Sequence, residues 1–397
     1  MRETRRRSRR SHRVGRVLIV LIVMAVGLAG GAYAATAVMK VPPPHELARI
    51  SFAAPSAWGE LFPYRTVEAG EPRALTSSPQ APPAQVPWKG GEIAFEEFLS
   101  TTHTNSFVVL QDGDLAYEWY ADGVDATTRQ SSFSMAKSLV SLLVGQAIGR
   151  GELSESDRLV DLLPELETGS DYDQVTIQHL LDMTAGVDVS EVYNAYWPFT
   201  GTSRMFLTRD LPGFVRDHRT VDSVPGTEAV YRSVDTELLG LVLARVTGRT
   251  LSGLLSSGIW KPVGAEHSAR WSLDREGGHE KAFAAVNATA RDFARVGQLV
   301  LDRGRVEDQQ VLPAEWVDRI ATPAPLPVDG WGYSAQWWHP PGGDGEDFSA
   351  LGIHGQYTYV NPATRTVIVK LSDHGTEEDE QETFDALRAV AAHLGDS

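Results

Sequence analysis

Residues 131–148 form an apolar stretch that contains a single charged side chain, that of Lys137. Apolar residues recur there at spacings of three and four, which predicts a buried helix over about 134–148 that ends at Gly149. Residues i and i+3 share one face of a helix, so the ammonium group of Lys137 is expected within reach of the Ser134 hydroxyl. We therefore expect a fold in which this helix is buried and carries Ser134 and Lys137 in its first turn.

This pair of side chains is suited to nucleophilic catalysis. A serine hydroxyl needs a nearby base to take its proton, and a lysine is a base only when it is neutral. Burial and a helix N-terminus both lower a lysine pKa from its usual value of about 10.4. The backbone N–H of Ser134 is one of the free donors at the helix start and could hold an oxyanion. The alternative is a helix whose lysine extends to solvent, although a solvated face normally carries more than one charge.

The N-terminus predicts export of the chain body. Residues 1–16 hold eight arginines and one glutamate, and residues 17–39 carry no charge over 23 positions, enough to span a bilayer. The basic flank predicts that residues 1–16 stay in the cytoplasm and that the body lies outside the cell membrane. Ala32-Tyr33-Ala34 resembles a signal-peptidase site, so an uncleaved anchor and a secreted chain cut near Ala34 both stay open, with the anchor favoured.

Charge and cysteine content exclude several classes of protein. The whole chain has a net charge of −16, and residues 1–16 have a net charge of +7, so the rest of the chain has a net charge of −23. This strongly acidic body argues against a nucleic acid as partner. The chain has no cysteine, which excludes disulfide scaffolds, thiolate nucleophiles and Cys-ligated zinc. Ten of the 22 prolines lie in residues 41–90, and we expect residues 40–90 to form an extended stalk whose Trp58, Leu61, Phe62 and Tyr64 pack on the body.

The order of predicted elements indicates an α+β fold for residues 91–397. Residues 107–120 read as two strands around an Asp112-Gly113 turn, and residues 357–371 as a second strand pair. Between them lie predicted helices at 134–148, 176–184, 236–247 and 288–303, and a last helix is expected at 382–394. We therefore expect an antiparallel sheet built from both chain ends, with flanking helices and an inserted helical region.

Two further stretches could complete a site around Ser134. Tyr231 leaves a turn just before a predicted helix, where its phenol could share or replace the role of Lys137 as base, or could simply be a core tyrosine. The small residues around Gly352 and Gly355 would let backbone approach a ligand closely and offer a second N–H donor.

Together these motifs resemble a known enzyme superfamily. Ser134-Met-Ala-Lys137, Tyr231-Arg-Ser233 and the stretch from Gly352 to Gln356 are similar, in this order, to the three motifs of the serine β-lactamases and penicillin-binding proteins. Within it, the chain resembles the class C-like branch that contains 6-aminohexanoate-dimer hydrolases and related esterases. The resemblance covers about residues 90–394 and implies the β-lactamase/transpeptidase-like fold, preceded here by one transmembrane helix.

The resemblance also implies a role for each site residue. Ser134 would be the acyl-enzyme nucleophile, Lys137 its activating partner and Tyr231 the general acid/base toward the leaving group. The backbone N–H groups of Ser134 and Ile353 would form the oxyanion hole. For substrate contacts the resemblance implies Tyr193, with Tyr196 as its competitor, together with Ser233 and His354.

Departures from the family pattern narrow the expected reaction. The lysine that begins the third motif in the family is replaced here by Ala350, in the stretch Ala350-Leu351-Gly352. The chain therefore lacks a charge-assisted contact to a substrate carboxylate that is worth about 1.5–3 kcal/mol. We therefore expect a serine hydrolase that cleaves a small-molecule or short-peptide amide or ester, needs no metal or organic cofactor, and disfavours β-lactams. The alternatives are a D-amino-acid peptidase, a β-lactamase-type enzyme, or a non-catalytic protein that binds a peptide at the same site; the sequence assigns no oligomeric state.

Overall fold

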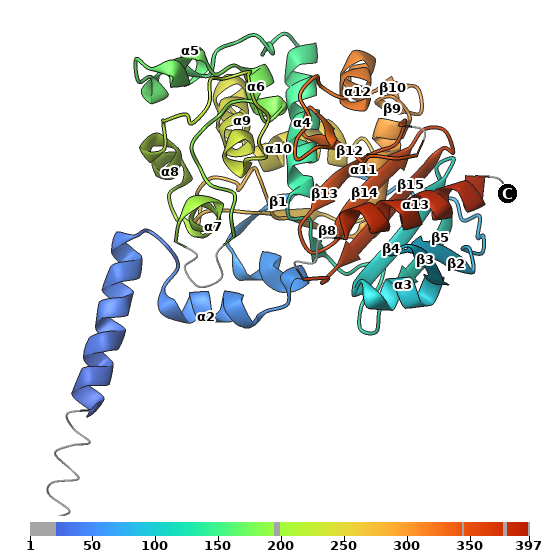
Figure 1. Cartoon of the computed structure of the whole chain (residues 1–397), viewed down its shortest axis with the longest axis horizontal. Coiled ribbons are helices and arrows are strands. Elements are labelled where there is room, and N and C mark those ends of the chain that lie inside the picture. Colours follow the sequence, from blue (N-terminus) through green and yellow to red (C-terminus); the bar gives the residue numbers. More distant parts are fainter. Residues whose placement is uncertain (1–20, 194–198, 344, 376–378, 396–397) are drawn as a thin grey trace, which may run out of the picture.

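The fold is described from a computed structural model, which describes residues 21–193, 199–343, 345–375 and 379–395. The predicted basic tail, the first residues of the apolar segment and Tyr196 lie outside these residues. An apolar helix, Leu21–Val38, projects from the body (Figure 1). It is long and apolar enough to cross a bilayer, and a signal sequence in this place would have the same properties.

A seven-stranded antiparallel sheet forms one half of the body (Figure 1). The sheet combines strands from both ends of the chain, because β4, which pairs with β5, also pairs with β15, the last strand of the chain. In spatial order the strands are β11 (Gly332–Ser334), β12 (Trp337–His339), β13 (Phe348–Gly352), β14 (Gln356–Asn361), β15 (Thr366–Ser372), β4 (Thr104–Gln111) and β5 (Asp114–Tyr120). The expected sheet from both chain ends is confirmed.

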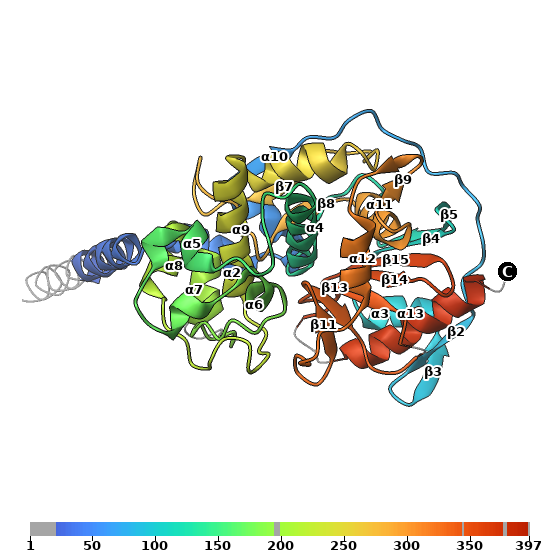
Figure 2. The ribbon, with the colours of Figure 1, turned by 90° about the horizontal axis from the view of Figure 1, so that it is seen from above.

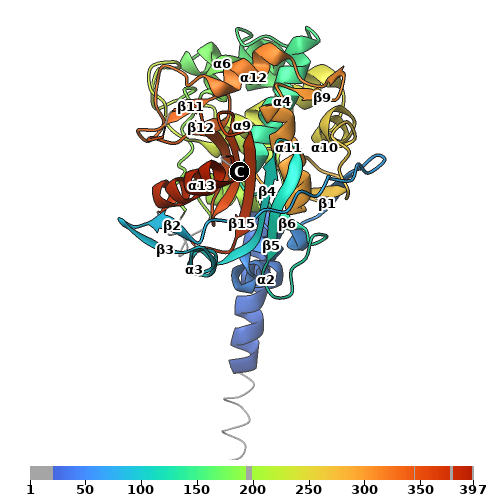
Figure 3. The same cartoon turned by 90° about the vertical axis from the view of Figure 1, so that its right-hand side faces the viewer.

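Helices cover both faces of this sheet, which explains why its central strands are apolar on both sides. Phe107, Val109 and Ile368 face the layer of α3 (Phe95–Thr101) and α13 (Glu380–Gly395), seen to the left of the strands in Figure 3. The alternate residues, such as Val108 and Val367, belong to the core shared with α4 (Met135–Gly149) and α11 (Ala290–Leu301).

The predicted serine-lysine helix is α4, and it lies between the sheet and the helical region (Figure 2). Nearly all of its residues are buried, which accounts for the absence of a polar face in the sequence. A Cβ on Gly145 would lie 2.2 Å from the ring of Trp316, so only glycine lets this indole pack on the helix. Each large apolar side chain buried here contributes about 1.5–3 kcal/mol.

The inserted helical region packs on the other side of α4. Its longest helix, α9, runs from Ser233 to Thr247 and contacts α4, α6 and α10. The other elements are α5 (Leu159–Leu162), η2 (Pro164–Leu166), η3 (Asp171–Gln174), α6 (Ile177–Leu181), α7 (Gly201–Leu207), α8 (Leu211–Asp217), α10 (Leu251–Leu255) and η4 (Ser256–Trp260). Helix α12 (Ala314–Ala321) lies on the sheet side of α4 (Figure 2) and contacts β11. Figure 2 shows this region and the sheet on opposite sides of α4.

A smaller four-stranded sheet leads the chain into α4. Its order is β1 (Tyr64–Val67), β7 (Ala269–Ser272), β8 (Val286–Ala288) and β6 (Gln130–Ser131). Two hairpins complete the strands, β2 (Gln85–Trp88) with β3 (Gly91–Ala94) and β9 (Arg305–Val306) with β10 (Gln309–Gln310). Since β6 ends just before Ser134, this sheet fixes where the nucleophile candidate stands.

Residues 40–90, expected as a stalk, contain folded elements that pack on the body. These are α2 (Pro44–Phe52), η1 (Pro55–Leu61), β1 and β2. Phe62 is buried, and Trp58 and Leu61 pack with it against Phe206 and Leu207. The boundary at residue 90 between stalk and catalytic domain stays a prediction.

Candidate active site

The nucleophile candidate stands on a constrained turn at the start of α4. Ser132 donates its N–H to the carbonyl of Val286 in β8 at 2.8 Å and accepts the N–H of Val286 on its hydroxyl at 3.1 Å. Phe133 follows with φ +44°, a conformation that costs a residue other than glycine about 1–2 kcal/mol. This turn leaves Ser134 partly exposed while Phe133 is buried.

Lys137 is buried beneath this serine with its side chain fully enclosed. Its Nζ donates to Oγ of Ser134 at 2.8 Å and to the carbonyl of Phe283 at 3.0 Å, and the side chain is 1% exposed. Burial lowers the pKa of Lys137 to about 8, against the opposite effect of the negative charge on Glu191. A fraction of the lysine on the order of one tenth is therefore neutral at pH 7 and able to accept the serine proton.

Tyr231 completes a triad of polar side chains around Oγ of Ser134. The Lys137 Nζ lies 4.9 Å from the centre of the Tyr231 ring, and the ring packs against Trp338 at 5.4 Å. Burial and the charge of Glu191 raise the pKa of Tyr231, and a hydrogen bond with Ser134 acts in the opposite direction. The phenol is therefore protonated at neutral pH, which suits it to donate a proton rather than to serve as a phenolate base.

The end of β13 lies directly against the backbone of the nucleophile. A Cβ on Gly352 would lie 2.5 Å from the carbonyl of Ser132 and 3.2 Å from the backbone N of Ser134. Only a residue without a side chain permits this approach, which places the turn at Ile353 next to the start of α4.

A buried glutamine holds this turn in place. The Gln356 amide donates to the carbonyl of His354 at 2.9 Å and to that of Ser372 at 2.7 Å, and its oxygen accepts the N–H of Ser372 at 3.2 Å. His354 is in the left-handed region, and its Nδ1 lies 2.6 Å from the carbonyl of Gly375. Burial lowers the pKa of His354, so it is neutral near pH 7 and no cation for a substrate carboxylate.

The family model described as Beta-lactamase matches residues 95–392. The chain belongs to this family. It is a hydrolase of the beta-lactamase fold, a group that includes amidases, esterases and penicillin-binding proteins.

Individual relatives agree with this assignment. The chain is 29% identical over 338 residues to the 6-aminohexanoate-dimer hydrolase of Paenarthrobacter ureafaciens, which covers 79% of this chain and 83% of the relative. A Bacillus anthracis protein assigned to the 6-aminohexanoate-dimer hydrolases superposes with a TM-score of 0.78 at 24% identity, over 86% of this chain and 94% of that one. A family VIII carboxylesterase shares the fold at a TM-score of 0.59 and 16% identity, over 74% and 95% of the two chains.

One acidic side chain of this beta-lactamase-family site was missed by the sequence analysis. The Glu191 carboxylate accepts the N–H of Ser233 at 2.9 Å, the hydroxyl of Ser233 at 2.6 Å and the hydroxyl of Tyr193 at 3.0 Å. A fourth donor, the hydroxyl of Thr202, lies 2.6 Å away. The only signal in the sequence was an acid two positions before Tyr193, and a glutamate in a polar loop is usually solvated.

The remaining predicted contacts can be placed on this network. Ser233 is 1% exposed and donates both its backbone N–H and its hydroxyl to Glu191, so this hydroxyl is buried and occupied in the structure. Tyr193 is 50% exposed, whereas Tyr196 lies outside the described residues. The ring of His354 packs against that of Phe133 at a centroid distance of 5.0 Å, which places it beside the nucleophile turn.

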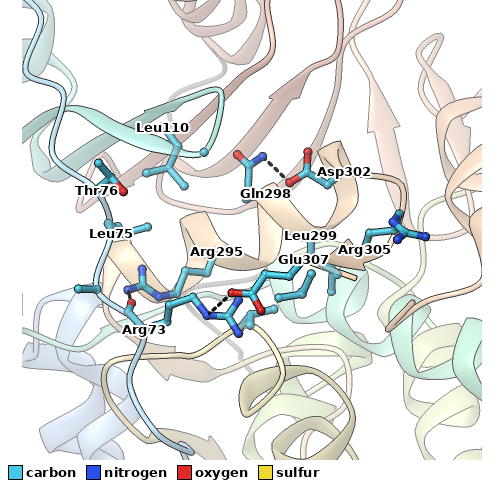
Figure 4. Close-up of a pocket in the computed structure, with 14 residues that line it drawn as sticks. Arg73, Leu75, Thr76, Leu110, Arg295, Gln298, Leu299, Asp302, Arg305 and Glu307 are labelled. Carbon is cyan, nitrogen blue, oxygen red and sulfur yellow. Dashed lines mark hydrogen bonds and ion pairs between the residues drawn. The ribbon is translucent and has the colours of Figure 1, made fainter. Parts of the chain in front are cut away.

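A cavity of about 240 Å³ elsewhere in the body is separate from these residues (Figure 4). It lies along α11, and Arg73 and Glu307 meet at 3.5 Å beside it while Gln298 donates to Asp302 at 2.7 Å. None of the candidate catalytic residues lines it. Within the described residues, no group of three or more His, Cys, Asp or Glu side chains is arranged to hold a metal ion.

Proposed function

We propose that this chain is a serine hydrolase that cleaves an amide or ester through an acyl-enzyme on Ser134. The observation that carries the proposal is the 2.8 Å contact between Oγ of Ser134 and Nζ of a buried Lys137 whose pKa is lowered to about 8. A buried lysine costs folding free energy, and its position beside a serine is a reason to retain it.

In the acylation step the neutral amine of Lys137 takes the proton of Ser134 as Oγ attacks the substrate carbonyl. The oxyanion that forms is held by the N–H groups of Ser134 and Ile353, each worth on the order of 10²–10³ in rate. As the bond to the leaving amine or alcohol breaks, the phenol of Tyr231 gives that group its proton. The proton held by Lys137 then returns to the Tyr231 oxygen, so both side chains recover their starting states.

Deacylation reverses these roles with water in place of the leaving group. The amine of Lys137, with Tyr231 as relay, takes a proton from water as the water oxygen attacks the acyl carbonyl. The tetrahedral intermediate collapses, the ester bond to Ser134 breaks, and the Lys137 ammonium returns its proton to Oγ as the carboxylic acid leaves. No metal or organic cofactor takes part in the proposed cycle.

The substrate class follows from the surroundings of the serine. Ala350 stands where relatives of the penicillin-binding type carry a lysine, and His354 is neutral, so a substrate carboxylate has no cation at this position. We therefore propose an uncharged amide or ester group near the scissile bond, with Tyr193 in contact with the substrate. The apolar N-terminal helix and its arginine-rich flank support a location outside the cytoplasmic membrane.

The proposal is tested with a fluorophosphonate probe, p-nitrophenyl acetate and the linear 6-aminohexanoate dimer. The parent chain should be labelled and should hydrolyse at least one of the two substrates, whereas Ser134→Ala and Lys137→Ala should lose labelling and activity. Ser156→Ala, an exposed serine, is the matched control and should behave as the parent. A Ser134→Ala chain that labels as well as the parent would show that the nucleophile lies elsewhere.

A further inference from the structure

The junction between the N-terminal helix and the body is folded. Nζ of Lys40 lies 2.5 Å from the Asp210 carboxylate, and the carbonyl of Lys40 accepts the N–H of Arg209 at 2.7 Å. Val41 is 2% exposed. The two contacts of Lys40 and the burial of Val41 leave no extended linker between the helix and the body.

The first element after this junction is suited to a membrane surface. Helix α2 runs across the axis of the Leu21–Val38 helix, as Figures 1 and 3 both show. Ile50 is buried against the body, whereas Phe52 at the end of α2 is 91% exposed. The other exposed residues of α2, His45, Ala48, Arg49 and Ser51, are polar or small, so Phe52 is the large apolar side chain that this helix can insert into the headgroup layer beside a membrane span.

An apolar cluster connects this junction to the nucleophile turn. Met39 and Leu47 pack with Trp58 in one cluster. The Trp58 ring then meets the Phe133 ring at 5.7 Å and the His354 ring at 6.0 Å. Phe133 directly precedes Ser134, so packed apolar side chains connect the junction to the turn that carries the nucleophile candidate.

A second exposed apolar side chain stands on the loop that carries Tyr193. Val192 is 74% exposed, and it follows Glu191, the acceptor for Ser233. Phe199, further along the same loop, packs against the junction cluster. Exposed apolar side chains therefore stand both on α2 and on the loop that carries Tyr193, two segments that meet the same cluster.

We propose that the enzyme works on the bilayer surface and that its substrate is an amphiphilic amide or ester whose apolar chain stays in the outer leaflet while its polar end reaches Ser134. This inference rests on the proposed function and adds the substrate class. The bilayer is the partner of exposed Phe52 because α2, which carries it, begins at Pro44, six positions after the apolar helix ends at Val38. A substrate concentrated in the leaflet meets an enzyme that is held at the same surface, and no cation for a substrate carboxylate is needed there.

The first test measures the orientation of the body on the bilayer. Because the chain has no cysteine, Phe52→Cys and Val224→Cys each provide one unique site for an environment-sensitive nitrobenzoxadiazole label. Val224 is also exposed, at 58%, but its turn packs near His179 of α6, at the end of the body away from the helix (Figure 1). In phosphatidylcholine vesicles that contain a spin-labelled lipid, the full chain should be quenched at position 52 and not at position 224. Equal quenching at both positions, or none at position 52, would overturn the inference.

The second test measures the substrate class with the full chain in the same vesicles. The ratio of activities on 4-methylumbelliferyl palmitate, which partitions into the bilayer, and 4-methylumbelliferyl acetate, which is soluble, is compared among variants. For Phe52→Glu this ratio should fall by about tenfold or more because an inserted aromatic ring is replaced by a charge, whereas Val224→Glu should keep the parent ratio.

The outcomes separate the two proposals. If Phe52→Glu keeps the parent's ratio of palmitate to acetate hydrolysis and the parent hydrolyses the acetate ester, the proposal of a membrane-bound substrate is wrong. The proposal of a serine hydrolase is then unaffected. A parent chain that neither hydrolyses the acetate ester nor reacts with the fluorophosphonate would overturn the proposed function, and this inference with it.

Discussion

Ser233 donates both its backbone N–H and its hydroxyl to the carboxylate of Glu191, at 2.9 and 2.6 Å. The same carboxylate accepts from Tyr193, so one acid joins the first turn of α9 to the loop expected to contact substrate. Its charge also acts on the reacting groups, because it raises the pKa of both Lys137 and Tyr231. Glu191 is thus electrostatically coupled to the proposed base and acid without touching either proton.

Glu191→Gln should shift the pH dependence of hydrolysis as well as weaken the fold. Without the negative charge the pKa of Lys137 falls, so the rising limb of kcat/KM moves to lower pH. The glutamine amide has one acceptor oxygen, so it can accept hydrogen bonds from fewer of the four donors that Glu191 binds. This loss should lower the free energy of unfolding by about 1–3 kcal/mol. Glu97→Gln, at an exposed position, is the control, and both variants are compared by pH profiles and thermal unfolding. An unshifted limb in Glu191→Gln would rule out the electrostatic coupling.

The parent enzyme should show a kcat/KM that rises with pH and levels off above pH 8. The active form needs neutral Lys137, whose pKa is about 8, so the rate should rise about tenfold per pH unit below that value. The raised pKa of Tyr231 keeps the phenol protonated over this range. Rates measured from pH 5 to 9.5 in buffers of constant ionic strength test this, and a plateau that begins below pH 6 would contradict Lys137 as base.

Lys137→Met should abolish activity and stabilise the chain at pH 7. Burial lowers the native pKa from 10.5 to about 8, so the native state must hold a buried charge at low pH. The unfolded state binds more protons between pH 8 and 10.5, and the stability of the parent therefore rises with pH across this window. At pH 7 the substitution should raise the unfolding free energy by about 1–3 kcal/mol. Denaturant unfolding at pH 7 and 10 should show a larger gain at pH 7, and equal gains at both would contradict this explanation.

Gly352→Ala should reduce kcat strongly because the new methyl group meets backbone on the nucleophile turn. The contacts would be 2.5 Å to the carbonyl of Ser132 and 3.2 Å to the N of Ser134, and neither atom is at the end of a flexible side chain. We expect a loss of about 1–3 kcal/mol in stability and of about 10²-fold in kcat, the size of one lost oxyanion donor. Gly91→Ala is the matched control, because its added Cβ meets only one atom, at 3.9 Å.

Gln356→Met should lower kcat more than it changes KM. The buried amide holds the carbonyl of His354 and the end of β15, and through them it fixes the turn that carries Ile353. Loss of this support should cost about 10- to 10²-fold in kcat, because a donor that is displaced by a fraction of an ångström stabilises the oxyanion less. The same substitution at exposed Gln309 is the control, and steady-state kinetics on p-nitrophenyl acetate provide the comparison.

Much of the fold could be predicted because local patterns carried it. The Asp112-Gly113 turn forms with both residues at positive φ, as a two-residue hairpin requires. The predicted helix over 134–148 is α4, Met135–Gly149. The helix expected at 236–247 begins earlier, at Ser233, because the polar first turn of α9 is held by Glu191 rather than by an apolar face.

The site was predicted only where its residues stand in short motifs. Ser134 and Lys137 are one helical turn apart, so their contact follows from helix geometry alone. Glu191 lies 42 positions before Ser233, and the expectation that Trp58 packs on the body names no partner for it. Neither position has a local period that indicates what it will meet.

The sequence by itself determined the buried serine-lysine helix, the hairpins and the apolar N-terminal segment, because each depends on neighbours within a few residues. Only the tertiary structure decided which acid faces the site, how closely β13 approaches Ser134 and that the junction after the N-terminal helix packs beside the nucleophile turn. These contacts join segments distant in the chain, and they form because the whole core packs at once.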